Sequence, residues 1–293
     1  EERADDEALA FLWMQRALME DPTHDHSLAE VERLARMLDG WSQLADTYAE
    51  VLETAQNEDA RIFVGRRLAQ VYEVELGDLQ RAEETYRYVL GIRNDEESLE
   101  ALDRIYDSYG AHEALAEILN RRIQLGQGSF DQVELNYRLA QLLENDLRRV
   151  DEAMAIYQRI LKDVDAQHID SLRALQNIFV QQEDWRSLFD VFAKELEVTF
   201  EDSAQADIVA AMAYLAAEKL GDAARAIELW RQVLELRGED AEALNALGNI
   251  YASQQNWQDL VEILDREANV EESEAVRVQI YSDLGRIWFE KLG

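Results

Sequence analysis

The sequence predicts an all-α solenoid of stacked helical hairpins, on three observations. An 18-residue block recurs four times, beginning near residues 27, 98, 171 and 243, at intervals of 71, 73 and 72 residues. The 293 residues include one proline and 12 glycines, the residue types that most disfavour helix interiors. Hydrophobic residues make up 47% of the chain, and they recur at helical spacing. A unit repeated at a fixed period buries its apolar face against its neighbours, which is how a solenoid is built.

The recurring block supplies the first helix of one hairpin. In the last copy, Leu244, Leu247, Ile250 and Tyr251 form one apolar helical stripe, and Trp257 follows a short turn and begins the second helix. The other copies place Trp41, His112 and Trp185 there. We therefore expect His112 to be a packing residue rather than a general base.

The other hairpin of each unit is marked by an alanine that an aromatic residue follows four positions later. The pairs are Ala82–Tyr86, Ala153–Tyr157 and Ala226–Trp230. The small residue lets two helices approach closely, and the aromatic ring fills the groove between neighbouring hairpins. Glycine follows the long preceding helix at Gly77, Gly221 and Gly293, where a left-handed cap conformation is expected.

Each unit of about 72 residues thus holds four helices, and the chain about sixteen, in about eight hairpins. No linker interrupts the pattern, so residues 1–293 are expected to form one solenoid with no second domain. We further expect this stretch to be part of a longer array. The expected helices span residues 4–20, 27–39, 41–55, 57–76, 78–92, 95–109, 111–125, 129–147, 149–163, 167–182, 184–198, 202–220, 222–237, 239–254, 256–270 and 272–292.

These patterns resemble the tetratricopeptide repeat family. The leucine–glycine pair Leu247–Gly248, with Asn249 and Tyr251, and the alanine–aromatic step of the other hairpin carry the resemblance. The glycine is replaced in the other blocks by Glu32, Asp103 and Gln176. The resemblance implies a right-handed superhelix of divergent hairpins, whose first helices line a concave groove that binds an extended or helical peptide.

The same resemblance indicates which side chains would contact a peptide in that groove. The candidate contacts are Arg33, Arg104, Arg173, Asn177, Asn245 and Asn249. The alternative for these residues is an ordinary solvated helix face.

Acidic residues outnumber basic ones by 62 to 29, a formal charge of −33 spread along the chain. This charge repels phosphate backbones and anionic membranes, so nucleic acid is not an expected partner. It favours a protein or peptide partner, and a basic one in particular. The alternative is that the charge only keeps a long helical array soluble. No apolar segment is long enough to span a membrane, and a soluble, cytoplasmic protein is favoured over a periplasmic or secreted one.

The sequence offers little for catalysis or metal binding. His24-Asp25-His26 could grip a divalent ion, but no second ligand pair matches it, so a solvated loop is the preferred interpretation. No phosphate-binding loop, nucleophile triad or zinc spacing is present. Acids at helix starts, such as Asp78, Asp222 and Asp240, are expected to be caps. No catalytic residue, metal or cofactor is therefore predicted.

The sequence as a whole predicts a non-enzymatic scaffold for protein–protein interaction. Two alternatives remain open. One is a structural segment that self-associates end to end through exposed repeat ends, and the other is a regulatory arm of a larger enzyme.

Overall fold

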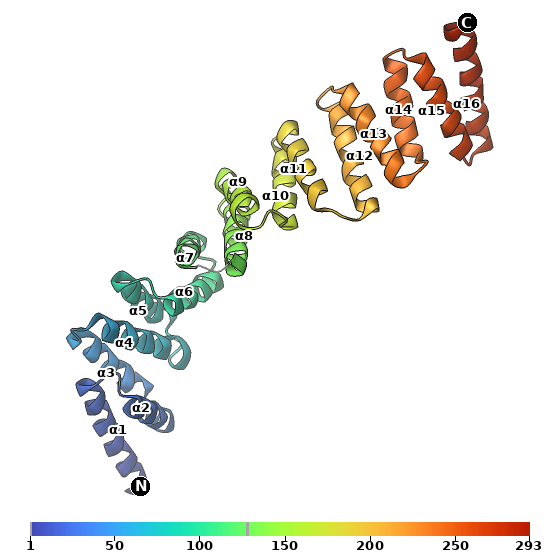
Figure 1. The fold of residues 1–293 in the computed structure, drawn as a ribbon. Coiled ribbons are helices and arrows are strands. Elements are labelled where there is room, and N and C mark those ends of the chain that lie inside the picture. The colour runs from blue at the N-terminus through green and yellow to red at the C-terminus, as the bar shows by residue number, and fades with distance from the viewer. Residues whose placement is uncertain (1, 127–128) are drawn as a thin grey trace. The chain divides into compact units, whose positions relative to one another are not determined.

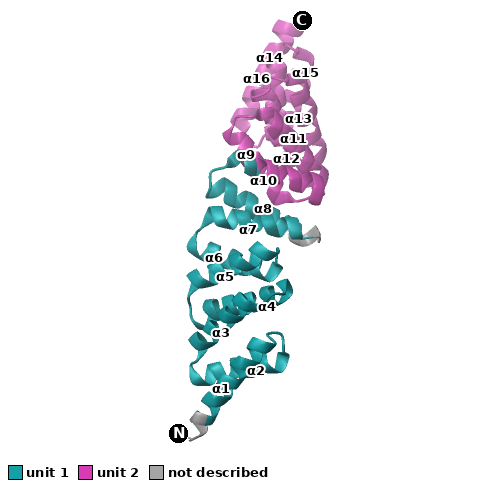
Figure 2. Ribbon diagram, turned by 90° about the vertical axis from the view of Figure 1, so that its left-hand side faces the viewer, with its two compact units in different colours: residues 1–153 teal, residues 154–293 magenta. Residues whose placement is uncertain are grey.

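The computed structural model describes residues 2–126 and 129–293, and within these ranges the secondary structure is helical with no strand (Figure 1). The chain divides into two compact units, residues 1–153 and 154–293 (Figure 2). Sixteen α-helices occur in the described ranges, which confirms the all-α hairpin array. The single continuous solenoid and its handedness stay predictions.

The first unit holds eight helices and the start of a ninth. They are α1 (Glu2–Glu20), α2 (Asp25–Leu38), α3 (Trp41–Thr54), α4 (Glu58–Gln70), α5 (Leu79–Ile92), α6 (Glu96–Tyr109), α7 (His112–Leu125), α8 (Ser129–Asn145) and the beginning of α9 (Val150–Arg159). A π-helical turn, η1 (Val71–Glu75), continues α4. Consecutive helices from α1 to α8 pack against each other, so each hairpin lies against the next.

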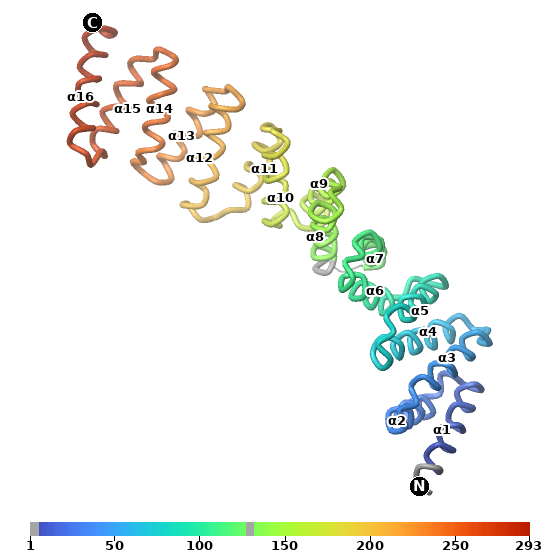
Figure 3. The backbone as a smooth tube through the Cα atoms, turned by 180° about the vertical axis from the view of Figure 1, so that it is seen from behind, coloured from blue at the N-terminus to red at the C-terminus, as the bar shows by residue number. Residues whose placement is uncertain are grey.

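The second unit repeats this arrangement. Its helices are α10 (Ile169–Gln181), α11 (Trp185–Val198), α12 (Asp202–Glu218), α13 (Ala223–Arg237), α14 (Ala241–Ser253), α15 (Trp257–Val270) and α16 (Glu274–Ile287), with π-helical turns η2 (Ile160–Val164) after α9 and η3 (Trp288–Leu292) after α16. From α10 to α16 each helix packs against the next, and α12 to α16 stand side by side in chain order (Figure 3).

The repeated apolar positions form the core. The stripe of α6, at Leu99, Leu102, Ile105 and Tyr106, is at most 4% exposed. The alanine anchors Ala82 and Ala226 are completely buried, as two helices in close contact require. Their aromatic partners are also buried, Tyr86 at 5% and Trp230 at 3% exposure.

The helix ends follow the repeat as well. Gly77, Gly221 and Gly293 have φ angles of 64°, 66° and 85°, which confirms the predicted left-handed caps. The thirteenth residue of every recurring block is also left-handed, and glycine occupies only one of those four places. These residues are Asp39, Gly110, Glu183 and Gln255, with φ angles of 54°, 63°, 55° and 56°.

Candidate binding site

The two candidate contacts of the first unit are already paired with acids. Arg33 on α2 donates to Glu30 from Nε at 3.0 Å and from Nη2 at 2.6 Å. Arg104 on α6 donates from Nη2 to Glu73 at 3.2 Å. Both arginines remain more than half exposed, so they lie on the surface with their charge partly neutralised.

The four candidates of the second unit lie on α10 and α14. Arg173 and Asn177 are exposed on α10. Asn245 and Asn249 are exposed on α14, where Asn249 Nδ2 donates to Asn245 Oδ1 at 3.0 Å. Of the six candidates, this asparagine pair is brought together by the structure, one helical turn apart on the first-helix face of its hairpin.

Both asparagines line an open cavity of about 370 Å³ formed by α14, α15, α16 and η3, which we call the α14–α16 pocket. Its apolar wall is Trp257, Leu260 and Leu264 of α15. Its charged lining is Glu267, Asp283, Arg286, Glu290 and Lys291. An apolar wall beside a few polar groups is the usual composition of a ligand pocket.

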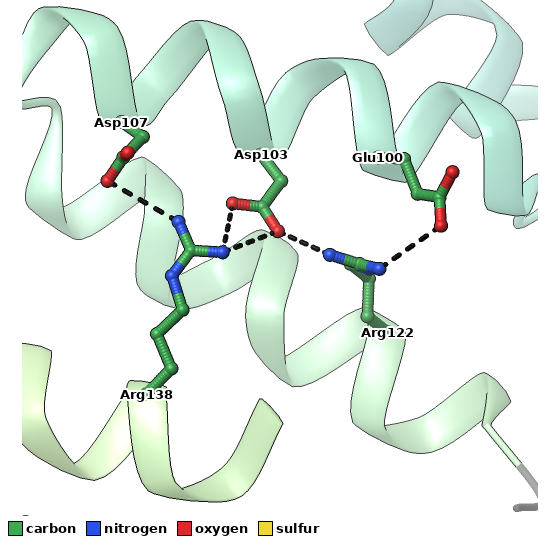
Figure 4. Close-up of polar contacts among 5 residues, drawn as sticks. All are labelled: Glu100, Asp103, Asp107, Arg122 and Arg138. Atoms are coloured by element: carbon green, nitrogen blue, oxygen red, sulfur yellow. Dashed lines mark hydrogen bonds and ion pairs between the residues drawn. The ribbon is translucent and has the colours of Figure 1, made fainter. Parts of the chain in front are cut away.

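In the first unit, an ion-pair network connects α6, α7 and α8 (Figure 4). Its centre is Asp103 of α6, a carboxylate only 3% exposed. Arg138 of α8 contacts Asp103 from Nη1, 2.7 Å from Oδ1 and 2.9 Å from Oδ2. Arg122 of α7 donates to Asp103 Oδ2 from the other side. Glu100 and Asp107 complete the network, 3.2 Å from Arg122 Nη2 and 3.4 Å from Arg138 Nη2.

The sixth residue of the recurring block decides whether such a network forms. In the first copy, Glu32 takes this position and accepts a hydrogen bond from Arg67 at 3.1 Å, which repeats the Asp103–Arg138 contact. In the third copy, Gln176 donates to Glu195 instead. In the fourth copy the residue is Gly248, which lines the α14–α16 pocket.

The sequence marks this position as a departure from the family's glycine, but the partners on the following helices were not predicted. Glu267 and Asp283 were not among the candidates. An alignment of the helices that follow each recurring block, at the period of the repeat, would have found Glu267 and Asp283. There two acids stand where the second copy has two arginines.

A second kind of cavity lies on the opposite, second-helix face. Arg231, Tyr251 and Arg266 line one of about 390 Å³ against α13, α14 and α15. A smaller one of about 230 Å³ recurs against α5, α6 and α7, where Arg87, Tyr106 and Arg121 take part. Because the cavity recurs with similar residues in both units, it is a general consequence of hairpin stacking.

The histidines have structural roles at helix ends. His24 and His168 precede α2 and α10, and the Nδ1 atom of each accepts a hydrogen bond of 3.3 Å from a backbone amide three residues later. Asp95 and Asp240 hold the same place in the other blocks. Asp78 and Asp222 also cap their helices as predicted. Across the described parts of the chain, no group of three His, Asp or Glu side chains is arranged to hold a metal ion.

The helices were compared with membrane-spanning helices in length and hydropathy. Among residues 2–126 and 129–293, none is both long enough and apolar enough to cross a bilayer.

The architecture defines an α-helical repeat protein of antiparallel hairpins. A tetratricopeptide repeat model matches residues 243–276, which contain most of α14 and all of α15, and a second tetratricopeptide repeat model matches residues 134–164. Tetratricopeptide repeats therefore occur in these two segments of the chain, and the fold of such repeats serves as a scaffold for protein–protein interaction. No curated protein matches the sequence.

Three solved structures are among those similar to this chain. MamA has 12% identity, a TM-score of 0.37, and coverage of 60% of this chain and 92% of its own. YrrB, described as a TPR protein with an unusual peptide-binding site, has 16% identity, a TM-score of 0.37, and coverage of 69% and 98%. The TPR2AB domain of yeast Sti1, in complex with pHSP90, has 13% identity, a TM-score of 0.32, and coverage of 79% and 98%. The family assignment rests on the sequence matches.

Proposed function

We propose that this protein is a non-enzymatic scaffold that binds a peptide segment of a partner protein on the first-helix face of its hairpins. The observation that carries the proposal is the α14–α16 pocket, in which Asn245 and Asn249 adjoin an apolar wall. Asparagine amides offer both a donor and an acceptor to a peptide backbone, and Trp257 offers an apolar surface to a side chain.

The charge of the chain supports a basic partner. A formal charge of −33 raises the encounter rate with a positively charged segment and lowers it for an acidic one. The same field makes the association sensitive to salt, since the Debye length falls to about 8 Å at physiological ionic strength.

Site-directed photocrosslinking in native lysate tests the proposal. A photoreactive residue at Asn249 should capture a defined protein at low salt and less of it at moderate salt. The matched control is the same residue at Gln258, which is exposed on α15 and does not line the pocket. Equal capture at both positions, or no capture at Asn249, would contradict a binding site on this face.

One observation favours a second function, assembly of copies end to end. Apolar side chains are exposed on α1 and on the last helical turn, including Trp13 at 57%, Trp288 at 57% and Phe289 at 86%. Burying such residues against a second copy would stabilise a stack of repeats. Sedimentation over a hundredfold concentration range tests this function, and a constant monomer mass would exclude it.

A further inference from the structure

We infer that the α14–α16 pocket receives the guanidinium group of an arginine side chain from the partner peptide. This inference rests on the proposed function and names the chemistry that the pocket recognises. It comes from comparing the pocket with the ion-pair network of the first unit.

The two sites occupy the same place in the repeat. The second and fourth blocks begin at Ser98 and Ala243, so equivalent positions differ by 145 residues. The five residues of the network are Glu100, Asp103, Asp107, Arg122 and Arg138. Their equivalents are Asn245, Gly248, Ala252, Glu267 and Asp283, and all five line the α14–α16 pocket. The pocket therefore lies at the place in the repeat that the network occupies in the first unit, where Glu100, Arg122 and Arg138 line a cavity of about 320 Å³.

The charges at the equivalent positions are reversed. In the first unit, a buried acid lies between two arginines. In the pocket, glycine replaces the acid, and the two arginine positions hold Glu267 and Asp283. The two arginine positions thus hold carboxylates, of which Asp283 already contacts Arg286, and a guanidinium group beside Glu267 would restore the balance with opposite signs.

Of the two carboxylates, Glu267 is the one free to accept hydrogen bonds from a ligand. Asp283 already accepts from Arg286 Nη2 at 2.6 Å and from Gln279 Nε2 at 3.2 Å. The Glu267 carboxylate makes no hydrogen bond or ion pair with any other residue that the structure describes, although the side chain is partly buried. A partly buried carboxylate gains more from a charge-assisted hydrogen bond than an exposed one does.

The other charged side chains lie at the edges of the pocket. Arg286 is 64% exposed, Glu290 adds a third acid, and Lys291 places its ammonium group 5.5 Å from the centre of the Trp257 ring. The five charged groups lining the pocket therefore carry a net charge of −1, which favours a cationic ligand.

The packing around Gly248 does not require a glycine. A Cβ atom added there would lie 3.9 Å from both Ile263 and Leu260, an ordinary van der Waals contact. The missing side chain therefore relieves no clash, and its effect is to open the cavity.

Arginine fits this space better than lysine does. Its planar group can bond to a carboxylate through two donors, and it stacks on aromatic rings such as Trp257. Its methylene stem can cover the apolar wall of Leu260 and Leu264 while the charged head meets Glu267. Asn245 and Asn249 remain available for the peptide backbone.

Fluorescence anisotropy with the whole chain tests the inference. The probe is a labelled peptide, Ala-Ala-Arg-Ala-Ala, and its competitors are the same peptide with lysine or with uncharged citrulline. We expect arginine to bind tightest and citrulline at least about tenfold more weakly, because it lacks the charge. Equal affinity for arginine and citrulline, or no binding of the arginine peptide, would overturn the inference.

Paired variants localise the effect. Glu267→Gln with Asp283→Asn should weaken the arginine peptide about tenfold, through loss of charge-assisted hydrogen bonds. Glu242→Gln with Asp265→Asn makes the same charge change at exposed positions outside the pocket and should leave binding unchanged. An equal loss in both pairs would mean a general field effect and would refute a defined site.

A triple variant places the central residues of the first unit's network in the pocket. Gly248→Asp, Glu267→Arg and Asp283→Arg transplants the network of the first unit and should close the pocket, abolishing binding while circular dichroism stays helical. Unchanged peptide affinity in this folded variant would overturn the inference. The photocrosslink at Asn249 is a separate readout, so a captured partner without arginine at that contact would refute the guanidinium site and leave the scaffold function standing.

Discussion

Lys219 and Trp185 form a cation–π pair, with the ammonium nitrogen 4.7 Å from the centre of the indole ring. The same pair recurs 72 residues later, as Lys291 over Trp257. In the first unit the equivalent positions hold Asp146 and His112, whose Oδ1 and Nδ1 atoms lie 3.4 Å apart. The first copy keeps the tryptophan as Trp41 but has Glu75 at the second position, so the two positions form a cation–π pair in the last two copies and an imidazole–carboxylate contact in the second.

This relationship predicts coupling between His112 and Asp146. His112→Trp alone places an aromatic face beside a carboxylate, and Asp146→Lys alone removes the carboxylate beside the imidazole. The double variant should regain about 0.5–1 kcal/mol relative to the sum of the single changes, because it recreates an exposed cation–π pair. Urea unfolding of the four proteins measures the coupling. Strictly additive changes would contradict it.

Left-handed residues at the hairpin turns predict a route to higher stability. Glu183 has a φ of 55° where the second block has Gly110, and a side chain there is strained. Glu183→Gly should raise the free energy of unfolding by about 0.5–1 kcal/mol, net of the entropy that glycine loses on folding.

Its neighbour Gln182 provides the matched control. Gln182 has a right-handed φ of −83°, so Gln182→Gly gives only the entropic loss and should destabilise the protein. Gly110→Ala should also destabilise it, because φ is 63° there and the added Cβ would lie 3.2 Å from His112 Nε2. Thermal melts that rank the glycine variants in the opposite order would reject this account.

The histidine cap of α10 predicts another stabilising change. His168 accepts from the Ser171 amide at 3.3 Å, while Asp240, at the equivalent place before α14, accepts at 2.9 Å from Ala243. An aspartate also interacts favourably with the helix dipole. His168→Asp should therefore raise stability by about 0.5–1 kcal/mol. Gln167→Asp adds the same charge one residue earlier and should give little, and equal gains from both would rule out capping as the cause.

The fold was largely predictable from the sequence, because a solenoid repeats its local signals. The apolar stripes, the buried anchors Ala82 and Ala226 and the glycine caps all occur as predicted. The site was less predictable. Asn245 and Asn249 are candidates through the family resemblance and stay predictions, whereas Glu267 and Asp283 were not named, because their significance depends on which side chains meet across three helices.

The network around Asp103 predicts a large effect of a small substitution. Asp103→Asn keeps the shape of the side chain but leaves Arg122 and Arg138 facing each other without their shared carboxylate. Breaking a fully buried pair costs about 3–5 kcal/mol, and the partial exposure of the two arginines, 21% and 35%, reduces the expected loss to about 2 kcal/mol. Asp107→Asn, at a carboxylate 66% exposed, should cost under about 0.5 kcal/mol. Similar urea midpoints for the two variants would contradict the central role of Asp103.

The buried phenol of Tyr106 predicts a loss of stability in alkali. Burial, together with a 2.9 Å hydrogen bond to Glu83, raises the pKa of Tyr106 to about 12, above its ordinary value of about 10. Between these values the folded chain keeps a proton that the unfolded chain releases. Because the folded state then binds more protons, the free energy of unfolding falls as pH rises from about 10 to about 12.

Removing the phenol should flatten this dependence. Tyr106→Phe gives up the hydrogen bond and should cost about 1 kcal/mol at pH 8, but its stability should fall less steeply above pH 10 than that of the natural protein. Some slope should remain, since burial also raises the pKa of Tyr48 and Tyr86. Tyr109→Phe, at a side chain 54% exposed, is the matched control. Urea midpoints between pH 8 and pH 11 measure all three proteins, and parallel curves for Tyr106→Phe and the natural chain would show that Tyr106 does not carry the effect.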